Sequence, residues 1–315
     1  MAGYIATRIG QAALVVVGVT AVVFVLDHLT PGSIARATLG PRASRPEIAA
    51  FNQANGLDRP VVEQYMSFLG RLVHGNLGYS YRLNQSVDSL VIHQLPNDLF
   101  LVGTSLVLAL AIAIPLGIAQ ALQRNRTFDH LATSFAFAVY SMPSYWLAIL
   151  LIAGLSIAAK LFPPEAPQAS NVGGLIGDPR GIVLPVLTLA LVYVALFSRY
   201  MRSAALDTLA QDYVRIARAK GLPMRLVVLR HVVRNSLLSV TTLVGLSVPA
   251  LLTAGLVIEY VFNVPGVGLS YYTAAVNADY PVELGITVLV GLATVLGNLL
   301  ADIAYACLDP RVRYE

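Results

Sequence analysis

The 315-residue chain has few charged residues and a single cysteine. Charged residues make up 12% of the sequence and hydrophobic residues 57%, whereas soluble domains are roughly one quarter charged. The lone Cys307 excludes an internal disulfide and a metal site built from several cysteines. No Gly-Lys dipeptide occurs, which excludes the phosphate-binding loop G-x-x-x-x-G-K-[ST] and an ATPase that uses it. This composition predicts a membrane protein, because a soluble domain could not bury so much apolar surface.

Six apolar runs are long enough to cross a bilayer, which takes about twenty residues. They lack the period-two alternation of barrel strands, so they are expected to be helices. The runs are Ile9–Leu26, Leu99–Leu122, Leu131–Leu161, Ile182–Ser198, Ser236–Ile258 and Leu284–Leu308. The predicted fold is therefore all-α and polytopic, with about six transmembrane helices. In the third run, Pro143 is expected to bend the helix.

Basic residues gather on one side of this topology, which predicts that both termini are cytoplasmic. Thirteen fall on that side, against Lys160 and Arg180 in the two short outer loops. The thirteen are Arg8, Arg124, Arg126, Arg199, Arg202, Arg215, Arg218, Lys220, Arg225, Arg230, Arg234, Arg311 and Arg313. Basic inner loops beside anionic lipid also explain the net charge of +4 without nucleic acid as a partner. A cleaved signal ending at Ala35-Arg36-Ala37 is the alternative for the first run, but the length of the run favours retention.

Three parts follow from this topology. We expect residues 1–30 to form the cytoplasmic N-terminus and first span, residues 31–98 an external segment, and residues 99–315 a five-span transmembrane domain. In the external segment, Pro96-Asn97-Asp98 is expected to cap the second span. A short amphipathic helix on the outer surface is predicted by the helical spacing of Val62, Tyr65, Met66, Leu69 and Leu72.

Ionisable residues within the spans are costly and therefore candidates for function. Asp27 and Glu259 lie near outer ends of spans, and Asp302 is better placed for a hydrogen bond between helices. Three scattered carboxylates do not form a proton relay. Polar and aromatic residues that could line a translocation path are Tyr140, Tyr193 and Asn298.

The long basic cytoplasmic segment, residues 199–235, is named here the coupling segment. Its pattern predicts a helix from about Ser203 to Lys220, a left-handed cap at Gly221, and a second helix that begins at Pro223. Ala217, Ala219 and Gly221 would offer a thin surface that a partner's groove can approach closely. The alternative is a solvated loop whose arginines only fix the topology.

The sequence Asp212-Tyr-Val-Arg-Ile-Ala-Arg-Ala-Lys-Gly221-Leu resembles the coupling-loop signature of binding-protein-dependent ABC importer permeases. The likeness is to the first permease of the oligopeptide, dipeptide and nickel group, the dipeptide-permease B type. It extends along the chain through Gly56–Pro60, Gly75–Ser80, Glu259–Gly268, Asp279–Val282 and Leu308–Tyr314. The resemblance implies a type I ABC importer permease fold in the bacterial cytoplasmic membrane.

The resemblance also implies a role for the coupling segment, whose short helix would insert into a groove on an ATPase subunit. Arg215-Ile216-Ala217 stands where the wider signature has Glu-Ala-Ala, so Arg215 replaces an acid. The residues implied in the ATPase contact are Asp212, Tyr213, Arg215, Ile216, Ala217, Arg218, Ala219, Lys220 and Gly221.

Further implications concern partners and cargo. The resemblance implies a heterodimer with a second permease, two ATPase subunits or domains that hold ATP and magnesium, and an external solute-binding protein. This chain itself would carry no cofactor and no catalytic site. Di- or oligopeptides are the expected cargo, with nickel chelates, glutathione, haem-like compounds or sugars as alternatives. Two competing hypotheses remain. The chain could be a secondary transporter driven by an ion gradient, or an export or assembly scaffold.

Overall fold

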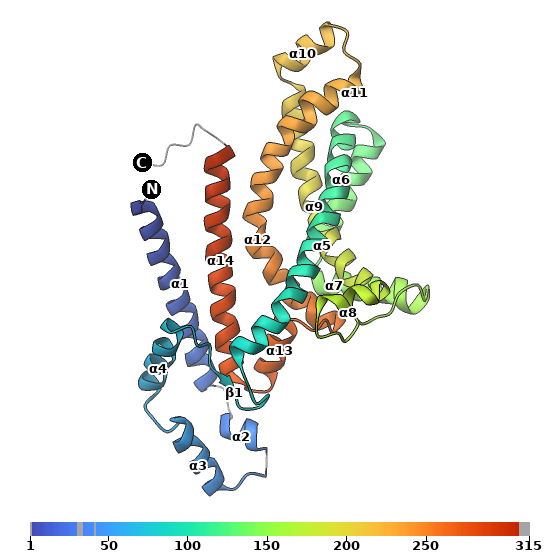
Figure 1. Cartoon of the computed structure of the whole chain (residues 1–315). Coiled ribbons are helices and arrows are strands. Elements are labelled where there is room, and N and C mark those ends of the chain that lie inside the picture. The colour runs from blue at the N-terminus through green and yellow to red at the C-terminus, as the bar shows by residue number, and fades with distance from the viewer. Residues whose placement is uncertain (1, 30–33, 41, 309–315) are drawn as a thin grey trace. The chain divides into compact units, whose positions relative to one another are not determined.

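The computed structural model describes residues 2–29, 34–40 and 42–308, and most of them are helical (Figure 1). Within these ranges the side chains of residues 2–9, 12, 27, 34, 37, 242, 246, 248–254 and 298–308 are not described. The chain forms two compact units. Unit 1 comprises residues 1–98, 169–172 and 265–295, and unit 2 comprises residues 99–168, 173–264 and 296–315.

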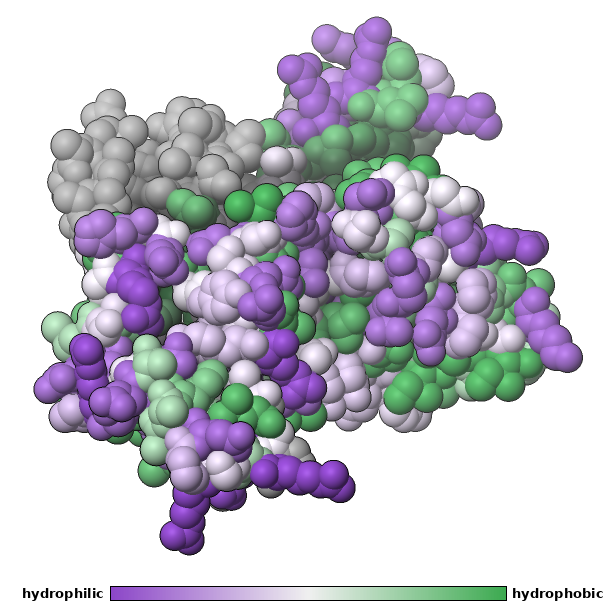
Figure 2. Space-filling view, turned by 60° about the horizontal axis from the view of Figure 1, so that its bottom comes forward, coloured by the Kyte–Doolittle hydropathy of each residue, from purple (hydrophilic) through white to green (hydrophobic). Residues whose placement is uncertain are grey.

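Unit 1 combines helices with one small hairpin. Its helices are α1 (Ala2–Leu29), α2 (Ile34–Leu39), α3 (Arg45–Asn55), α4 (Val61–Val73), α13 (Val267–Val276), and the first parts of α5 (Val87–Leu122) and α14 (Tyr280–Leu308). Strands β1 (Tyr79–Ser80) and β2 (Gln85–Ser86) pair antiparallel. In Figure 2 the end that carries α3 comes forward, and hydrophilic side chains cover much of it. A water-exposed surface at this end fits the prediction that residues 31–98 lie outside the membrane.

Helix α4 confirms the predicted amphipathic helix, although its buried face differs in detail. Phe68 is only 3% exposed and packs with Phe24 of α1 and Leu284 of α14. Val62 and Met66, which the spacing placed on the apolar face, are exposed. The helix therefore buries the face centred on Phe68, a residue that the predicted pattern omitted.

The expected cap at Pro96-Asn97-Asp98 is wrong, because α5 begins at Val87 and continues through these residues. Their polar side chains instead bind other parts of unit 1. Asn97 donates to the carbonyl of Pro265 at 2.7 Å, and the carboxylate of Asp98 accepts from the amide of Val267 at 3.0 Å. Asp98 thus satisfies the first amide of α13, where a helix favours negative charge.

The hairpin is joined to the start of α14 by a buried hydrogen bond and close backbone packing. The Ser80 hydroxyl donates to the Asp279 carboxylate. Burial raises the pKa of Asp279, and the bond from Ser80 acts in the opposite direction. Gly78 has a φ of +111°, and a Cβ there would lie 3.5 Å from Pro281. These contacts fix the hairpin against the rest of unit 1.

Unit 2 is a helical assembly that holds the coupling segment. Its elements are the second part of α5, α6 (Thr127–Ser141), α7 (Ser144–Leu151), the π-helix η1 (Ile152–Ala158), α8 (Val172–Gly177), α9 (Pro179–Leu209), α10 (Asp212–Ala219), α11 (Met224–Val227), the π-helix η2 (Val228–Val233) and α12 (Arg234–Phe262). Helices α9 and α12 pack side by side (Figure 1). One apolar cluster joins α5 to α9 through residues such as Ala109, Tyr193 and Phe197.

Among the described residues, four helical stretches are long and apolar enough to span a membrane, and a bent pair of helices raises the number to five. The four are Val87–Leu122, Pro179–Leu209, Met224–Gly245 and Tyr280–Gly297. Helix α1 contains a shorter apolar stretch, Ala13–Leu26. The predicted all-α, polytopic class is confirmed, and each of the six predicted runs falls on helical structure.

The predicted bend at Pro143 is a full break. The third run divides into α6 and the pair α7–η1, whose axes differ by 109°. Met142 is extended, with φ −83° and ψ 136°, because the residue before a proline is disfavoured in the helical region. Two shorter helices therefore replace the single long one that the apolar run suggested.

Close packing of α5 on α9 depends on Gly117. A Cβ at this position would lie 2.7 Å from the carbonyl oxygen of Ser198 and 2.9 Å from the amide nitrogen of Arg202. Both are backbone atoms, so the two helices must separate before any side chain fits.

We therefore predict that Gly117→Ala destabilises the protein by about 1–3 kcal/mol, the usual cost of overpacking. The measurement is thermal unfolding of the purified protein in detergent, where the melting temperature should fall. Gly103→Ala, on the same helix with no neighbouring atom within 4 Å, is the matched control. Equal melting temperatures for the two variants would contradict the proposed contact.

Candidate functional site

The coupling segment begins within the last part of α9, and the predicted single helix from Ser203 to Lys220 is wrong. Helix α9 stops at Leu209, and α10 starts at Asp212. Gln211 between them is extended, with φ −71° and ψ 147°, which ends one helix and caps the next. The break turns α10 away from the axis of α9, so α10 is a separate short helix at the tip of the α9–α12 pair (Figure 1).

A tight turn closes α10 as predicted. Gly221 adopts a φ of +81°, the left-handed conformation that glycine favours. Its amide donates to the carbonyl of Arg218 at 3.0 Å, and the Leu222 amide donates to the carbonyl of Ala217 at 3.3 Å. Pro223 follows in an extended conformation directly before α11, one position earlier than a first helical residue. The predicted sequence of helix, glycine turn and helix is confirmed.

The inner face of α10 is apolar. Val214 and Ala217, one turn apart, pack against Val227 of α11, with Leu209 and Leu222 alongside. Val214 and Val227 are fully buried, and Ala217 is 7% exposed. Ala217 therefore belongs to the base that holds α10 in place. Because Ala217 is buried, it is not part of the thin outer surface that was predicted from Ala217, Ala219 and Gly221. Ala219 and Gly221 are exposed.

The outer face of α10 combines positive charge with exposed apolar side chains. Ile216 is 55% exposed and Tyr213 41% exposed. The exposed cations of the turn and its two helices are Arg215, Arg218, Lys220 and Arg225. Arg215 lies 3.4 Å from the Asp212 carboxylate in a solvent-exposed pair, which contributes little stability. This face is an accessible basic surface with an apolar centre.

Side-chain contacts attach α10 to the start of α12. The Tyr213 hydroxyl accepts a hydrogen bond from Asn235 at 3.0 Å, and the Tyr213 ring lies 6.1 Å from the ring of His231. One turn further in, the hydroxyls of Thr208 and Ser236 are 3.2 Å apart and buried. Movement of α10 would therefore act on both α9 and α12.

Sequence reasoning missed an ion pair that joins α6 to α9. Arg202 donates to the Asp129 carboxylate through Nε and Nη2, each at 2.6 Å. Asp129 also accepts from the Asn125 amide at 3.0 Å. Its side chain is 2% exposed and that of Arg202 is 27% exposed. In the sequence analysis Arg202 indicated only the membrane topology. Asp129, which follows the basic pair Arg124 and Arg126, could have suggested an ion-pair partner for it.

The structure describes the side chains of two of the three residues proposed for a translocation path. Tyr140 is half exposed, with the Arg199 guanidinium 5.4 Å from its ring. Tyr193 is 5% exposed and packs in the core of unit 2 beside Phe197. The side chain of Asn298 lies outside the described residues, as do those of Asp27 and Asp302. Their role in transport stays a prediction.

Glu259 is the one predicted intramembrane carboxylate whose side chain is described. It is 1% exposed. The described part of the chain holds no cluster of three or more His, Cys, Asp or Glu side chains able to bind a metal. The coupling segment is therefore the candidate functional site.

Known families match nearly the whole chain. Residues 113–314 match the family described as "Binding-protein-dependent transport system inner membrane component", and residues 1–102 match the N-terminal membrane component of such systems. Among relatives, the "Oligopeptide transport system permease protein AppB" of Bacillus subtilis is 36% identical, with both chains fully covered. The "Dipeptide transport system permease protein DppB" of Escherichia coli is 32% identical, again with full coverage. The "Probable D,D-dipeptide transport system permease protein DdpB" of Escherichia coli is 36% identical over 95% of this chain and 94% of the relative.

The helical membrane fold together with the family match defines a membrane subunit of a transport system. The chain belongs to the family of inner membrane components of binding-protein-dependent transport systems. It is accordingly a multi-pass inner-membrane permease of the ABC importer class. The resemblance inferred from the coupling-loop sequence is confirmed.

We predict that Asp129 and Arg202 stabilise unit 2 as a pair. Asp129→Asn or Arg202→Gln alone should lower the free energy of unfolding by about 2–3 kcal/mol, because each leaves a partly buried charge unpaired. The double variant should lose at least about 1 kcal/mol less than the sum of the single losses. Denaturant unfolding of the four proteins in detergent measures this coupling, and additive losses would show that the pair is energetically unimportant.

Proposed function

We propose that this permease pairs with a second, related permease, and that two ATPase subunits or domains bind the cytoplasmic side of the pair. An extracytoplasmic solute-binding protein delivers the cargo, as the family's dependence on binding proteins suggests. ATP and magnesium bind the partner ATPases, and this chain contributes no catalytic residue. Both termini lie in the cytoplasm, in keeping with the distribution of basic residues.

The geometry of α10 is the observation that carries the proposal. Its buried face, Val214 and Ala217, holds the helix on its own subunit, while Ile216 is exposed among cations and Tyr213 is partly exposed beside Asn235. An amphipathic helix of this kind fits a groove with an apolar floor and acidic edges. We assign the ATPase contact to the predicted residues between Asp212 and Gly221. Within this set Ala217 lies on the inner face and supports the contact by holding α10 in place.

Transmission of force follows from the connections of α10. Closing of the two ATPases on ATP would move their grooves, and with them the helix seated in each groove. Helix α9 is continuous over 31 residues, or about 46 Å at 1.5 Å per residue. The bonds from Tyr213 to Asn235 and from Thr208 to Ser236 pass the same movement to α12. The cytoplasmic contact can thereby reorient helices that cross the membrane.

Arg215 distinguishes this coupling helix from the wider signature, which has an acid at that place. Its side chain is 76% exposed and makes only a weak pair with Asp212. An exposed cation at this position would favour an ATPase whose groove is acidic there. We propose that Arg215 contributes to the choice of ATPase.

Peptides are the cargo we propose, because the relatives named above are oligopeptide and dipeptide permeases. Nickel chelates, glutathione and haem-like compounds are the alternative cargoes for the same machinery. No residue of the coupling segment is assigned to cargo, and the solute-binding protein largely sets selectivity. Uptake of labelled dipeptide into proteoliposomes that contain the complete complex and its binding protein tests the cargo directly.

The same assay separates an ATP-driven importer from a secondary transporter. The proposal requires uptake that depends on ATP and on the ATPase subunits. Uptake that continues without those subunits and collapses with the proton gradient would contradict it. Co-purification of the ATPases and the binding protein with this chain would in turn count against an export or assembly scaffold.

We predict that Gly221→Asp reduces ATP-driven uptake at least tenfold, whereas Gly221→Asn reduces it less. Both side chains tolerate a positive φ better than most residues, and a Cβ at Gly221 meets no atom within 4 Å. The two variants therefore differ mainly in charge at the proposed contact with an acidic groove. Uptake and ATPase co-purification are measured together. Full uptake and normal assembly of the Gly221→Asp protein would show that this turn does not contact the ATPase.

A further inference from the structure

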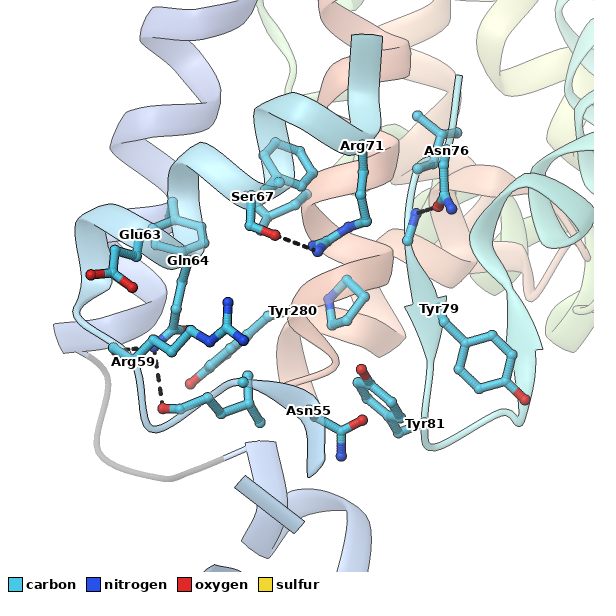
Figure 3. A pocket seen from close by; sticks show the side chains of 18 of the residues that line it. Asn55, Arg59, Glu63, Gln64, Ser67, Arg71, Asn76, Tyr79, Tyr81 and Tyr280 are labelled. Carbon is cyan, nitrogen blue, oxygen red and sulfur yellow. Dashed lines mark hydrogen bonds between the residues drawn. The ribbon is translucent and has the colours of Figure 1, made fainter. Parts of the chain in front are cut away.

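Unit 1 contains a cavity of about 550 Å³ that the coupling mechanism does not use. Its walls come from α1, the end of α3, α4, the β1–β2 hairpin and the start of α14 (Figure 3). The volume is typical of sites that bind small molecules. In the proposed topology this cavity lies outside the membrane, on the side from which cargo arrives.

The loop between α3 and α4 is held in a defined shape beside the cavity. Gly56 ends α3 with a φ of +67°, and the Gln64 side chain donates to the carbonyls of Leu57 at 3.2 Å and Arg59 at 2.8 Å. The Arg59 side chain passes close to Gly56, where a Cβ would lie 3.5 Å from its Nε. The wall that carries Arg59 is therefore ordered by its own hydrogen bonds.

Two guanidinium groups, those of Arg59 and Arg71, point into the cavity from different elements (Figure 3). Arg71 donates to the Ser67 hydroxyl at 3.1 Å, which leaves most of its donors available. Among the described residues, neither arginine forms an ion pair. Two cations without a carboxylate partner at one cavity are suited to bind an anion.

Tyrosine supplies the opposite wall. The Tyr81 hydroxyl faces the cavity (Figure 3), and its ring is fixed by edge contacts with Phe51 at 5.4 Å and Tyr79 at 5.7 Å. Burial raises the pKa of Tyr81, and the charge of Arg71 opposes this shift, which reflects how near the guanidinium lies. The phenol stays protonated at neutral pH and can donate a hydrogen bond to the same anion.

Two carboxylates also line the cavity. Asp88 accepts a hydrogen bond from the amide of Leu77 at 3.2 Å. The carboxylate of Glu63 lies at the edge of the cavity in Figure 3, directed away from Arg71. Within the described part of the chain neither carboxylate forms an ion pair with Arg59 or Arg71. The amide groups of Asn55, Gln64 and Asn76 lie at the same cavity.

We propose that this cavity binds a short peptide by its C-terminal carboxylate, with Arg59 and Arg71 as the cations and the surrounding amides as partners for the peptide bonds. An anion as ligand follows from the two arginines at one cavity. The choice of a peptide as the carrier of that carboxylate rests on the proposed function. The cavity would hold peptide outside the membrane and independently of the solute-binding protein.

The test uses the complete permease–ATPase complex in lipid nanodiscs, without ATP and without the solute-binding protein. Labelled Ala-Ala and Ala-Ala-Ala are titrated, with Ala-Ala amide as the probe that lacks the carboxylate. Saturable binding of at least one peptide is expected, and the amide should bind at least about tenfold more weakly, since a hydrogen bond to a charged group is lost. Arg59→Gln and Arg71→Gln should each weaken peptide binding by about tenfold or more.

Arg45→Gln is the matched control, because Arg45 is an exposed arginine of α3 that does not line the cavity. Its complex should bind peptide as the unchanged complex does, and all variants should have equal melting temperatures. The proposal fails if neither peptide binds, if the amide binds equally well, or if both arginine variants bind normally. It also fails if Arg71→Gln weakens capture of the solute-binding protein without affecting peptide binding, since the cavity would then take a carboxylate of that protein.

Uptake by the same proteins separates this inference from the proposed function. ATP-driven uptake with no peptide binding in the cavity would overturn only the cavity site. Absence of ATP-driven uptake, with peptide still bound at Arg59 and Arg71, would overturn the proposed function and leave the cavity site standing.

Discussion

Hydrocarbon offers no hydrogen-bond partner to the backbone, and this constraint decides where the chain can carry chemistry. Long helices such as α5, α9 and α14 satisfy their own backbone groups and present mostly apolar side chains. Charged surfaces are left to the connections between them. The coupling segment and the region of α3, α4 and the hairpin are the two connections with substantial structure of their own, and each supplies one of the sites proposed here.

The coupling segment works because its two faces are separated. Val214 and Ala217 pack on Val227 within the subunit, so Ile216 and the exposed cations remain for a partner. The left-handed Gly221 closes α10. The contact between Tyr213 and Asn235 joins α10 to α12, and the contact between Thr208 and Ser236 joins α9 to α12. A helix held this firmly can pass a displacement on to the membrane helices without absorbing it.

Features with a local cause could be predicted from the sequence. The apolar runs predicted the helical membrane class, and Gly221 predicted the turn at that position. The spacing of Tyr65, Leu69 and Leu72 predicted α4. Features that depend on distant partners could not be predicted. Asn97 and Asp98 look like a helix cap until Pro265 and Val267 are seen beside them. Asp129 and Arg202 are 73 residues apart, and the cavity is assembled from elements that are distant in sequence, so neither leaves a local pattern.

The central claim is that α10 contacts the ATPase through its outer face. Photo-crosslinking tests it most directly, with a benzoylphenylalanine at position 216, where Ile216 is 55% exposed, in the complete complex in membranes. The account predicts a crosslink to the ATPase subunit from position 216 and none from position 83, where an exposed leucine lies in the hairpin turn. Efficient crosslinking only to lipid or to the second permease from position 216 would contradict the account.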